Sequence, residues 1–457
     1  MNNYKSSNYN IFIDKLSENK SLIFNSYFDS YVVLDEQHMD ALNNISICDD
    51  EKIIADLSSQ GLIIKKDFYE LNNILINERI NKYRDGTLIL TIAPSMECNM
   101  DCPYCYESRK RGVMSLETEE KLFNWIENII KNGNFKSLSV TWYGGEPLLK
   151  IDTIERLSNK LIPLCADEKI NYFSSIVTNG ILLNRENSVI LKNCKIQFVQ
   201  VTIDGLKDEH NKRRLLKSNG DSFTTIINNI KENCDIININ VRSNIDKENI
   251  DEIDKLIDYL FIEQGLMNKI GLYFAPVTDI TKGCLFSDTC YSFKEFSEIE
   301  NYASQRIYDV TRDMKYLFYP SRRVMSCGAV SLNYFVIDHM GNLYKCWNNI
   351  CVEDKIVGNI NDKMNFINEE NYKWLSYNLS DNDKCKECEY LPLCMGGCPY
   401  FPINGFGNQC DHRIYSCKNY LRLYYQNYLR QKESNYNLNR LITEEGPETI
   451  IKLPLSV

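Results

Sequence analysis

Between residues 87 and about 275, short apolar runs alternate with longer amphipathic segments. The short runs are rich in β-branched residues and apolar throughout, which is typical of parallel strands buried on both faces. The longer segments carry charges on one side and apolar residues on the other, as surface helices do. The expected strands are 87–93, 137–143, 173–178, 196–204, 236–242 and 270–276. The expected helices between them are 115–131, 152–165, 185–192, 222–234 and 248–263.

This alternation predicts an α/β fold, a partial TIM-like (β/α)6 barrel over residues 87–320. In such barrels ligands bind at the carboxyl ends of the parallel strands. The loops that follow the strands are therefore expected to carry the chemistry.

The two ends of the chain show different patterns. Residues 1–86 read as short strands mixed with two helices, which predicts a small winged-helix-like α+β domain. In residues 321–457 the periodicity fades, and loops rich in Cys, Gly, Asn and Pro lead to a helix at 420–432. So little apolar periodicity indicates a third domain that needs covalent or metal staples to stay folded.

Composition limits the function classes. The chain has 457 residues, 44% of them hydrophobic and 25% charged, with a net charge of -10, which is typical of a globular protein. The negative charge gives no reason to expect a nucleic-acid or anionic-membrane partner. No apolar stretch approaches the roughly 18 to 20 residues of a membrane span. We expect a soluble cytoplasmic protein.

Cysteine usage is the strongest compositional signal. Eighteen cysteines without an export signal favour metal ligands or redox groups over disulfides. Four cysteines stand singly in periodic segments and read as small buried hydrophobes: Cys48, Cys165, Cys194 and Cys234. The remaining clusters need another explanation.

The first cluster, Cys98, Cys102 and Cys105, follows the strand at 87–93 with the spacing C-x3-C-x2-C. Three thiolates on a four-iron cluster leave one iron open to a substrate or cofactor. A structural zinc site usually closes with four ligands, and no fourth Cys or His stands nearby. We therefore expect an iron–sulfur site with an open position.

With Tyr104 before its last cysteine, this motif resembles the signature of the radical S-adenosylmethionine (SAM) enzymes. The resemblance implies a 4Fe-4S cluster whose open iron is chelated by the amino acid end of SAM. It makes Cys98, Cys102 and Cys105 both the cluster ligands and the catalytic residues.

Residues 144–147, Gly-Gly-Glu-Pro, follow the second strand. The glycines allow close approach of a ligand and Glu146 can accept from an ammonium, although such a sequence also suits a plain turn. In the radical SAM family the same motif holds the SAM amino group. The resemblance assigns SAM binding to Tyr104, Gly144, Gly145, Glu146, Pro147, Thr178, Asn179, Thr202, Asp204, Arg214 and Asn244. Arg214 aligns with the arginine that meets the SAM carboxylate, and its neighbour Arg213 is the alternative.

The second cysteine-rich region contains seven spaced cysteines: Cys327, Cys346, Cys385, Cys388, Cys394, Cys398 and Cys417. This set resembles the SPASM domain, which houses two auxiliary 4Fe-4S clusters and would bring the total to three. A zinc ribbon would use only the C-x2-C part and leave Cys327, Cys346 and Cys417 unexplained. The resemblance assigns the outer cluster to Cys385, Cys388, Cys394 and Cys417. It assigns the inner cluster to Cys327, Cys346 and Cys398.

The inner cluster has an open question. Some SPASM enzymes carry a further cysteine where this sequence has Asn333, so one iron is expected to stay open, unless Cys351 fills the position. Cys284, Cys290 and Cys410 also remain as alternatives.

The N-terminal domain and one position in the second region indicate the substrate. Residues 1–86 resemble the recognition element for ribosomally made, modified peptides (RiPPs), although a generic packing domain would show the same pattern. Sulfatase maturases resemble the overall layout, but carry an aspartate where this sequence has Trp347. We interpret the chain as a RiPP maturase similar to the thioether-forming sactipeptide and ranthipeptide synthases, acting on a precursor peptide bound through its leader.

The resemblance also implies the reaction. An electron donor such as flavodoxin or ferredoxin reduces the cluster, SAM is cleaved to a 5′-deoxyadenosyl radical, and hydrogen abstraction from the peptide leads to a Cys thioether. The alternatives are a carbon–carbon cross-link, epimerisation, a sulfatase-maturase-like oxidation, or a non-enzymatic iron–sulfur scaffold.

Overall fold

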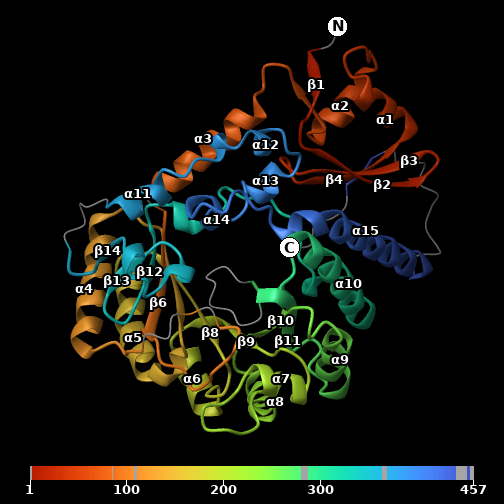
Figure 1. The fold of residues 1–457 in the computed structure, drawn as a ribbon. Coiled ribbons are helices and arrows are strands. Elements are labelled where there is room, and N and C mark those ends of the chain that lie inside the picture. The colour runs from red at the N-terminus through yellow and green to blue at the C-terminus, as the bar shows by residue number, and fades with distance from the viewer. Residues whose placement is uncertain are drawn as a thin grey trace. The chain divides into compact units, whose positions relative to one another are not determined.

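The computed structural model describes residues 3–84, 86–105, 107, 111–278, 287–362, 368–438 and 450–452. The chain divides into two compact units (Figure 1). The first unit combines residues 1–81, 297–326 and 378–457. The second combines residues 82–296 and 327–377.

The second unit contains a nine-stranded sheet in the order β11-β10-β9-β8-β7-β6-β12-β13-β14. Six consecutive strands pair in parallel: β6 (Thr87–Ser95), β7 (Ser137–Gly144), β8 (Asn171–Thr178), β9 (Ile196–Thr202), β10 (Ile239–Ile245) and β11 (Ile270–Pro276). The predicted α/β fold with a parallel six-stranded sheet is confirmed.

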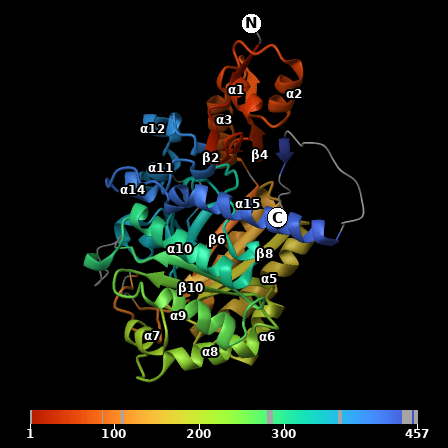
Figure 2. The same cartoon turned by 90° about the vertical axis from the view of Figure 1, so that its right-hand side faces the viewer.

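Helices follow most of these strands, as predicted. They are α4 (Leu116–Asn132), α5 (Ile151–Asp167), α6 (Arg185–Asn193), α7 (Lys207–Arg213), α8 (Ser222–Asn233) and α9 (Glu252–Asp258). In both views α5, α6 and α8 lie along the outer side of the strands (Figures 1 and 2). Alternate strand residues such as Leu90, Val140 and Trp142 are fully buried, so the sheet carries the core of this unit.

Two local predictions are corrected. The strand expected at 236–242 is β10 at 239–245, because the amides of Ile236 and Ile237 still bond to Asn233 at the end of α8. The helix expected at 248–263 is α9 followed by a π-helical turn, η2 (Tyr259–Glu263).

The sheet continues past β6 with strands that the sequence pattern did not predict. They are β12 (Tyr334–Ile337), β13 (Asn342–Tyr344) and β14 (Gly358–Asn359), and helix α11 (Glu369–Leu375) follows. Strand β12 pairs in parallel with β6, and β13 and β14 pair antiparallel. The short helical turns of this unit include η1 (Pro147–Lys150), η5 (Gly328–Val330) and η6 (Trp347–Asn349).

The first unit contains a four-stranded antiparallel sheet in the order β15-β4-β3-β2. The strands are β2 (Asn10–Ser17), β3 (Lys20–Asn25), β4 (Ser30–Asp35) and β15 (Ile450–Lys452). A second pair joins β1 (Tyr4–Ser6) to β5 (Ile63–Lys65). The N-terminal helices are α1 (Glu36–Asn43), α2 (Glu51–Ser59) and α3 (Glu70–Tyr83).

The other helices of this part of the chain are α10 (Phe293–Thr311), α12 (Asp383–Lys386), α13 (Leu391–Cys394), α14 (Tyr400–Ile403) and α15 (His412–Leu438). The core of the first unit joins both ends of the chain, because Ile11 and Phe24 pack with Leu393, Cys417 and Leu421. The N-terminal sheet and the cysteine-rich segment therefore share one core.

Within the described ranges, no helix is long and apolar enough to span a bilayer.

Candidate functional site

The predicted cluster loop, Cys98 to Cys105, leaves the carboxyl end of β6. Backbone hydrogen bonds tie it to the segment after α7: Asp101 N donates to Leu215 O at 2.9 Å and Lys217 N donates to Asn99 O at 3.0 Å. The Lys217 ammonium donates to Cys98 O at 2.8 Å. These bonds place Cys98 and Cys102 beside Arg214.

The thiols are poorly solvated. Burial raises the pKa of Cys98 to about 11 and also raises the pKa of Cys102, while the Arg214 charge acts in the opposite direction on both. Without a metal, both groups are therefore protonated at neutral pH, and binding of iron has to displace their protons.

Within the described residues, no three His, Cys, Asp or Glu side chains are arranged to hold a single metal ion. A four-iron cluster distributes its cysteine ligands over different irons, so its thiolates do not converge on one point. A loop carrying three closely spaced cysteines fits that requirement.

Gly144 and Gly145, at the end of β7, pack directly against the chain that leads into Cys98. Gly144 has φ +112°, and a Cβ there would lie 2.3 Å from Ser95 O. A Cβ on Gly145 would lie 2.5 Å from Glu97 O. Only glycine fits this approach, so the motif sets the position of the cysteine loop.

Glu146 is fully buried, and burial raises its pKa. Its carboxylate accepts from Thr178 Oγ1 at 2.7 Å, from Asn179 N at 2.7 Å and from Leu148 N at 2.9 Å. Pro147 begins the turn η1 directly after it. The Glu146 side chain therefore joins the ends of β7 and β8 and acts as a positioning group.

Asn179 connects the end of β8 to the cysteine loop. Its Nδ2 donates to Asn99 Oδ1 at 2.6 Å and lies 3.8 Å from Cys98 Sγ. Its Oδ1 accepts from Ile181 N at 3.0 Å. Thr178 and Asn179 are both buried, and their contact with the cysteine loop is partly buried.

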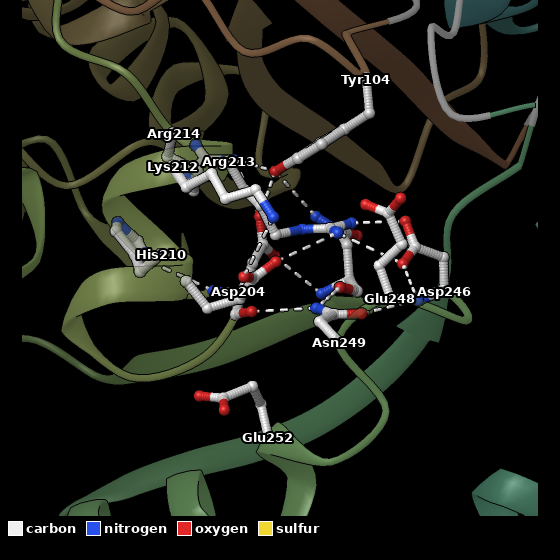
Figure 3. A network of polar contacts seen from close by, with 12 residues as sticks. Tyr104, Asp204, His210, Lys212, Arg213, Arg214, Asp246, Glu248, Asn249 and Glu252 are labelled. Atoms are coloured by element: carbon white, nitrogen blue, oxygen red, sulfur yellow. Dashed lines mark hydrogen bonds and ion pairs between the residues drawn. The ribbon is translucent and has the colours of Figure 1, made fainter. Parts of the chain in front are cut away.

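A polar network brings together the ends of β9 and β10 (Figure 3). The Tyr104 hydroxyl donates to Asp204 Oδ2 and accepts from Arg214 Nη1. Asp204 Oδ1 accepts from Asn244 N at 2.8 Å, and Asn244 Nδ2 lies 3.5 Å from the Tyr104 hydroxyl. Thr202, the last residue of β9, is buried and precedes Asp204 by two residues in the sequence. Four predicted site residues from distant parts of the chain thus meet here.

Arg213 and Arg214 occupy different environments. Arg213 is fully buried and donates to both oxygens of Asp246, at 2.6 and 3.2 Å. Arg214 Nη1 lies 3.8 Å from Asp204 Oδ2, and its buried Nε has no hydrogen-bond partner among the described residues. Arg214 therefore keeps a buried donor available to a carboxylate, whereas both Nη atoms of Arg213 are held by Asp246.

Sequence reasoning missed three residues of this network. His210 Nδ1 accepts from Asp204 N at 3.2 Å. Asn249 Nδ2 donates to Asp204 O and to Asn244 O, both at 2.9 Å, and Asp246 holds Arg213. A single histidine within α7 and a single aspartate and asparagine after β10 carry no spacing signal, so only their contacts reveal them.

In the second unit, Cys327 and Cys346 lie near Tyr334. Burial raises the pKa of Tyr334, and the charges of both thiolates add to the shift. Burial likewise raises the pKa of Tyr143, with contributions from Cys105 and Cys346. Trp347 stacks on Tyr143 at 5.8 Å between ring centroids. Tyr143 therefore lies between the first cysteine loop and Cys346.

The structure also places the residues that bear on an open iron. Asn333 Nδ2 donates to Arg84 O at 3.1 Å. Cys351 is buried in an apolar cluster with Ala93 and Val336, and its Sγ lies 4.0 Å from Asp338 Oδ2. Cys284 lies outside the described residues.

In the first unit, Cys410 lies close to the C-x2-C segment. The charge on Cys410 contributes, after burial, to the raised pKa of Cys385, Cys388 and Cys394. The Cys410 Cα lies 3.8 Å from where a Cβ on Gly397 would be. Cys417 is fully buried in the apolar core. Cys398 stays a predicted ligand of the inner cluster and Cys417 a predicted ligand of the outer cluster. Cys410 stays the alternative.

Comparisons with known proteins agree with this geometry. Residues 92–260 match the model of the radical SAM superfamily. The radical SAM cyclopropyl synthase TigE of Paramaledivibacter caminithermalis is 26% identical over 397 residues, which cover 79% of this chain and 79% of that protein. A cysteine-type anaerobic sulfatase-maturating enzyme of Clostridium novyi is 26% identical over 372 residues, covering 75% of this chain and 95% of that protein.

Among solved structures, the sulfatase-maturating enzyme anSMEcpe with bound AdoMet and a Cp18Cys peptide superposes with a TM-score of 0.56 and 20% identity. The match covers 77% of this chain and 99% of that chain. At this identity the likeness shows a shared fold.

Proposed function

We propose that this chain, whose residues 92–260 match the radical SAM superfamily, is a maturase that installs a Cys thioether cross-link in a ribosomally made precursor peptide. The domain implies SAM binding and one 4Fe-4S cluster. The observation that carries the proposal is the convergence of the cysteine loop with the Tyr104, Asp204 and Arg214 network at the carboxyl ends of the strands.

The residues present fit the cofactors. Cys98, Cys102 and Cys105 would hold the cluster, and the buried Arg214 Nε would meet the SAM carboxylate. When bound, the cluster and SAM supply a radical able to abstract hydrogen from an unactivated carbon. Arg214 favours the thiolate forms of Cys98 and Cys102, and Tyr104 and Asp204 hold its guanidinium in place.

Two auxiliary clusters are part of the proposal, with Cys327, Cys346 and Cys398 for the inner one. The core position of Cys351 supports an inner cluster that keeps an open iron for a substrate thiolate. The proposed ligands of the outer cluster remain Cys385, Cys388, Cys394 and Cys417. Cys410 is the alternative to Cys417, and its position near Gly397 supports it.

Trp347 supports peptide cross-linking over sulfatase-type oxidation. Sulfatase maturases carry an aspartate at the position of Trp347. The Trp347 ring stacks on Tyr143, and 45% of its surface is exposed. An indole at this position cannot act as a carboxylate base, but it offers a flat apolar wall for a peptide.

The partners belong to the proposal as well. We assign leader capture to residues 1–86 and reduction of the cluster to a flavodoxin or ferredoxin. We also propose a cytoplasmic location, since thiol ligands stay reduced there.

A mass measurement tests the function. The protein is incubated under reducing, anaerobic conditions with SAM and a synthetic precursor peptide that consists of a leader segment and a cysteine-containing core. We expect 5′-deoxyadenosine, a peptide lighter by about two hydrogens, and loss of one alkylatable thiol, because a thioether consumes a C–H and an S–H bond. The Cys98→Ala/Cys102→Ala/Cys105→Ala variant, which retains the strand core, is the inactive control.

A second candidate is sulfatase-maturase-like oxidation, favoured by the 95% coverage of the Clostridium novyi protein. It predicts oxidation of a sulfatase-derived Cys or Ser peptide by the wild-type chain. A peptide that loses two hydrogens while its thiols all remain alkylatable would instead indicate a carbon–carbon cross-link.

A further inference from the structure

The C-terminal strand β15 covers the outer edge of β4. Ile450, Ile451 and Lys452 pair antiparallel with Leu34, Val33 and Val32, in that order. The strand lies beside β4 in the first unit (Figure 2, dark blue). The chain's own tail therefore completes the N-terminal sheet.

Without β15, β4 would be the edge strand of a three-stranded sheet, since the order is β15-β4-β3-β2. An edge strand presents unpaired N–H and C=O groups that readily pair with another extended segment. Val32, Val33 and Leu34 are buried, so this edge is rigidly supported by the core behind it. Such an edge suits capture of a peptide as an added strand.

We propose that β15 is an internal competitor for this edge: the tail occupies it at rest and is displaced when an extended peptide adds to β4. That the incoming strand belongs to a substrate peptide rests on the proposed function. That the tail competes for the edge of β4 rests only on the pairing of β15 with β4.

The pairing is short enough to be reversible. Three residues form few ladder bonds, and short two-stranded pairings are marginal in water. The tail nevertheless competes well because it is tethered, at an effective concentration on the order of millimolar. The register also describes the partner: an extended segment that runs antiparallel to β4 and has consecutive β-branched residues, as Ile450 and Ile451 are.

The test uses the full chain and the tail sequence itself as the probe. In the Ile450→Pro/Ile451→Pro variant, one of the two prolines must remove a ladder N–H whichever residue donates, because donors alternate along an antiparallel strand. The matched control is Thr443→Pro/Glu444→Pro, which leaves residues 450–452 intact. A fluorescent peptide of residues 445–457 is titrated against each protein.

We expect the Ile450/Ile451 variant to bind the peptide about tenfold more tightly than wild type or the control, because the tethered competitor is gone. The backbone amides of Val32, Val33 and Leu34 should exchange hydrogen faster in that variant than in wild type. Adding the peptide should slow this exchange again. Equal peptide binding by all three proteins, or unchanged exchange in β4, would overturn the proposal.

The same variant separates this proposal from the proposed function. Tail-peptide binding that behaves as expected, with no thioether in any precursor peptide, would refute the function alone. A thioether product with no change in tail-peptide binding would refute the competitor alone.

Discussion

Arg213 and Arg214 are neighbours in sequence but bind different partners. Helix α7 ends at Arg213, which lies in the core on Asp246, while Arg214 turns toward Tyr104 and the cysteine loop. A shift of one residue at a helix end decides which guanidinium bonds to Tyr104 and which to Asp246. The sequence could not choose between them for that reason.

Replacing each arginine should separate the two roles. We expect Arg214→Ala to weaken SAM binding to the reconstituted protein about 10- to 100-fold, since a charged hydrogen bond is lost, while the fold remains. Arg213→Ala should lower the free energy of unfolding by about 3–5 kcal/mol, because Asp246 would be left buried and unpaired. Equilibrium dialysis and urea denaturation measure the two effects. Equal SAM affinity in Arg214→Ala and wild type would remove Arg214 from the site.

His210 makes stability depend on pH. Burial, and secondarily the Arg214 charge, hold its pKa well below 6.5 in the folded state. The unfolded chain therefore binds more protons below about pH 6.5, and the free energy of unfolding falls as pH falls, by up to about 1.4 kcal/mol per unit. His210→Asn keeps an acceptor for Asp204 N and removes the titration. Urea denaturation at pH 5 and 7 should show a smaller pH dependence in the variant; identical dependence would contradict this account.

At the scale of elements, α15 decides where the late cysteines lie. The helix begins at His412, after Cys410, and buries Cys417 and Leu421 against the N-terminal sheet. The pattern predicted a helix only over 420–432, because its first turns are polar. The sequence spacing favours Cys417 as a cluster ligand, whereas the fold brings Cys410 toward Cys385, Cys388 and Cys394.

Single substitutions distinguish these two cysteines. If the arrangement in the fold is the one that binds iron, Cys410→Ala loses up to about four irons per chain, since one cluster loses a ligand. Cys417→Ala then keeps its iron and loses about 1–2 kcal/mol of stability from the cavity. Iron analysis and the visible spectrum of the reconstituted proteins report the outcome. The reverse pattern would assign the ligand to Cys417.

At the scale of the whole molecule, the cysteine-rich end does not form a core alone. Leu393 and Leu421 pack on Ile11 and Phe24, and Leu391 and Met395 pack on Tyr9 and Ile74. Arg422 Nε donates to Asp14 Oδ2 at 3.0 Å across the same unit. Residues 1–80 therefore support the segment that follows residue 378.

Deleting residues 1–80 should accordingly do more than remove a peptide-binding domain. We expect a lower melting temperature and less iron per chain, because each exposed core side chain costs about 1.5–3 kcal/mol. Thermal unfolding and iron analysis of the truncated protein measure this. The mild control is Phe12→Ser, since Phe12 is exposed on β2. A truncated protein with full iron and unchanged melting would show that the C-terminal segment folds independently.

The sequence alone determined the parallel α/β fold, because strand and helix periodicities are local and repeat six times. It also predicted the cluster loop, since cysteine spacing and the glycines of residues 144–147 leave few other chemistries. Only the tertiary structure decided that Arg214 bonds to Tyr104 while Arg213 pairs with Asp246, that Glu146 bonds to the end of β8, and that β15 covers β4. These facts depend on contacts between residues far apart in the chain, and no local pattern records them.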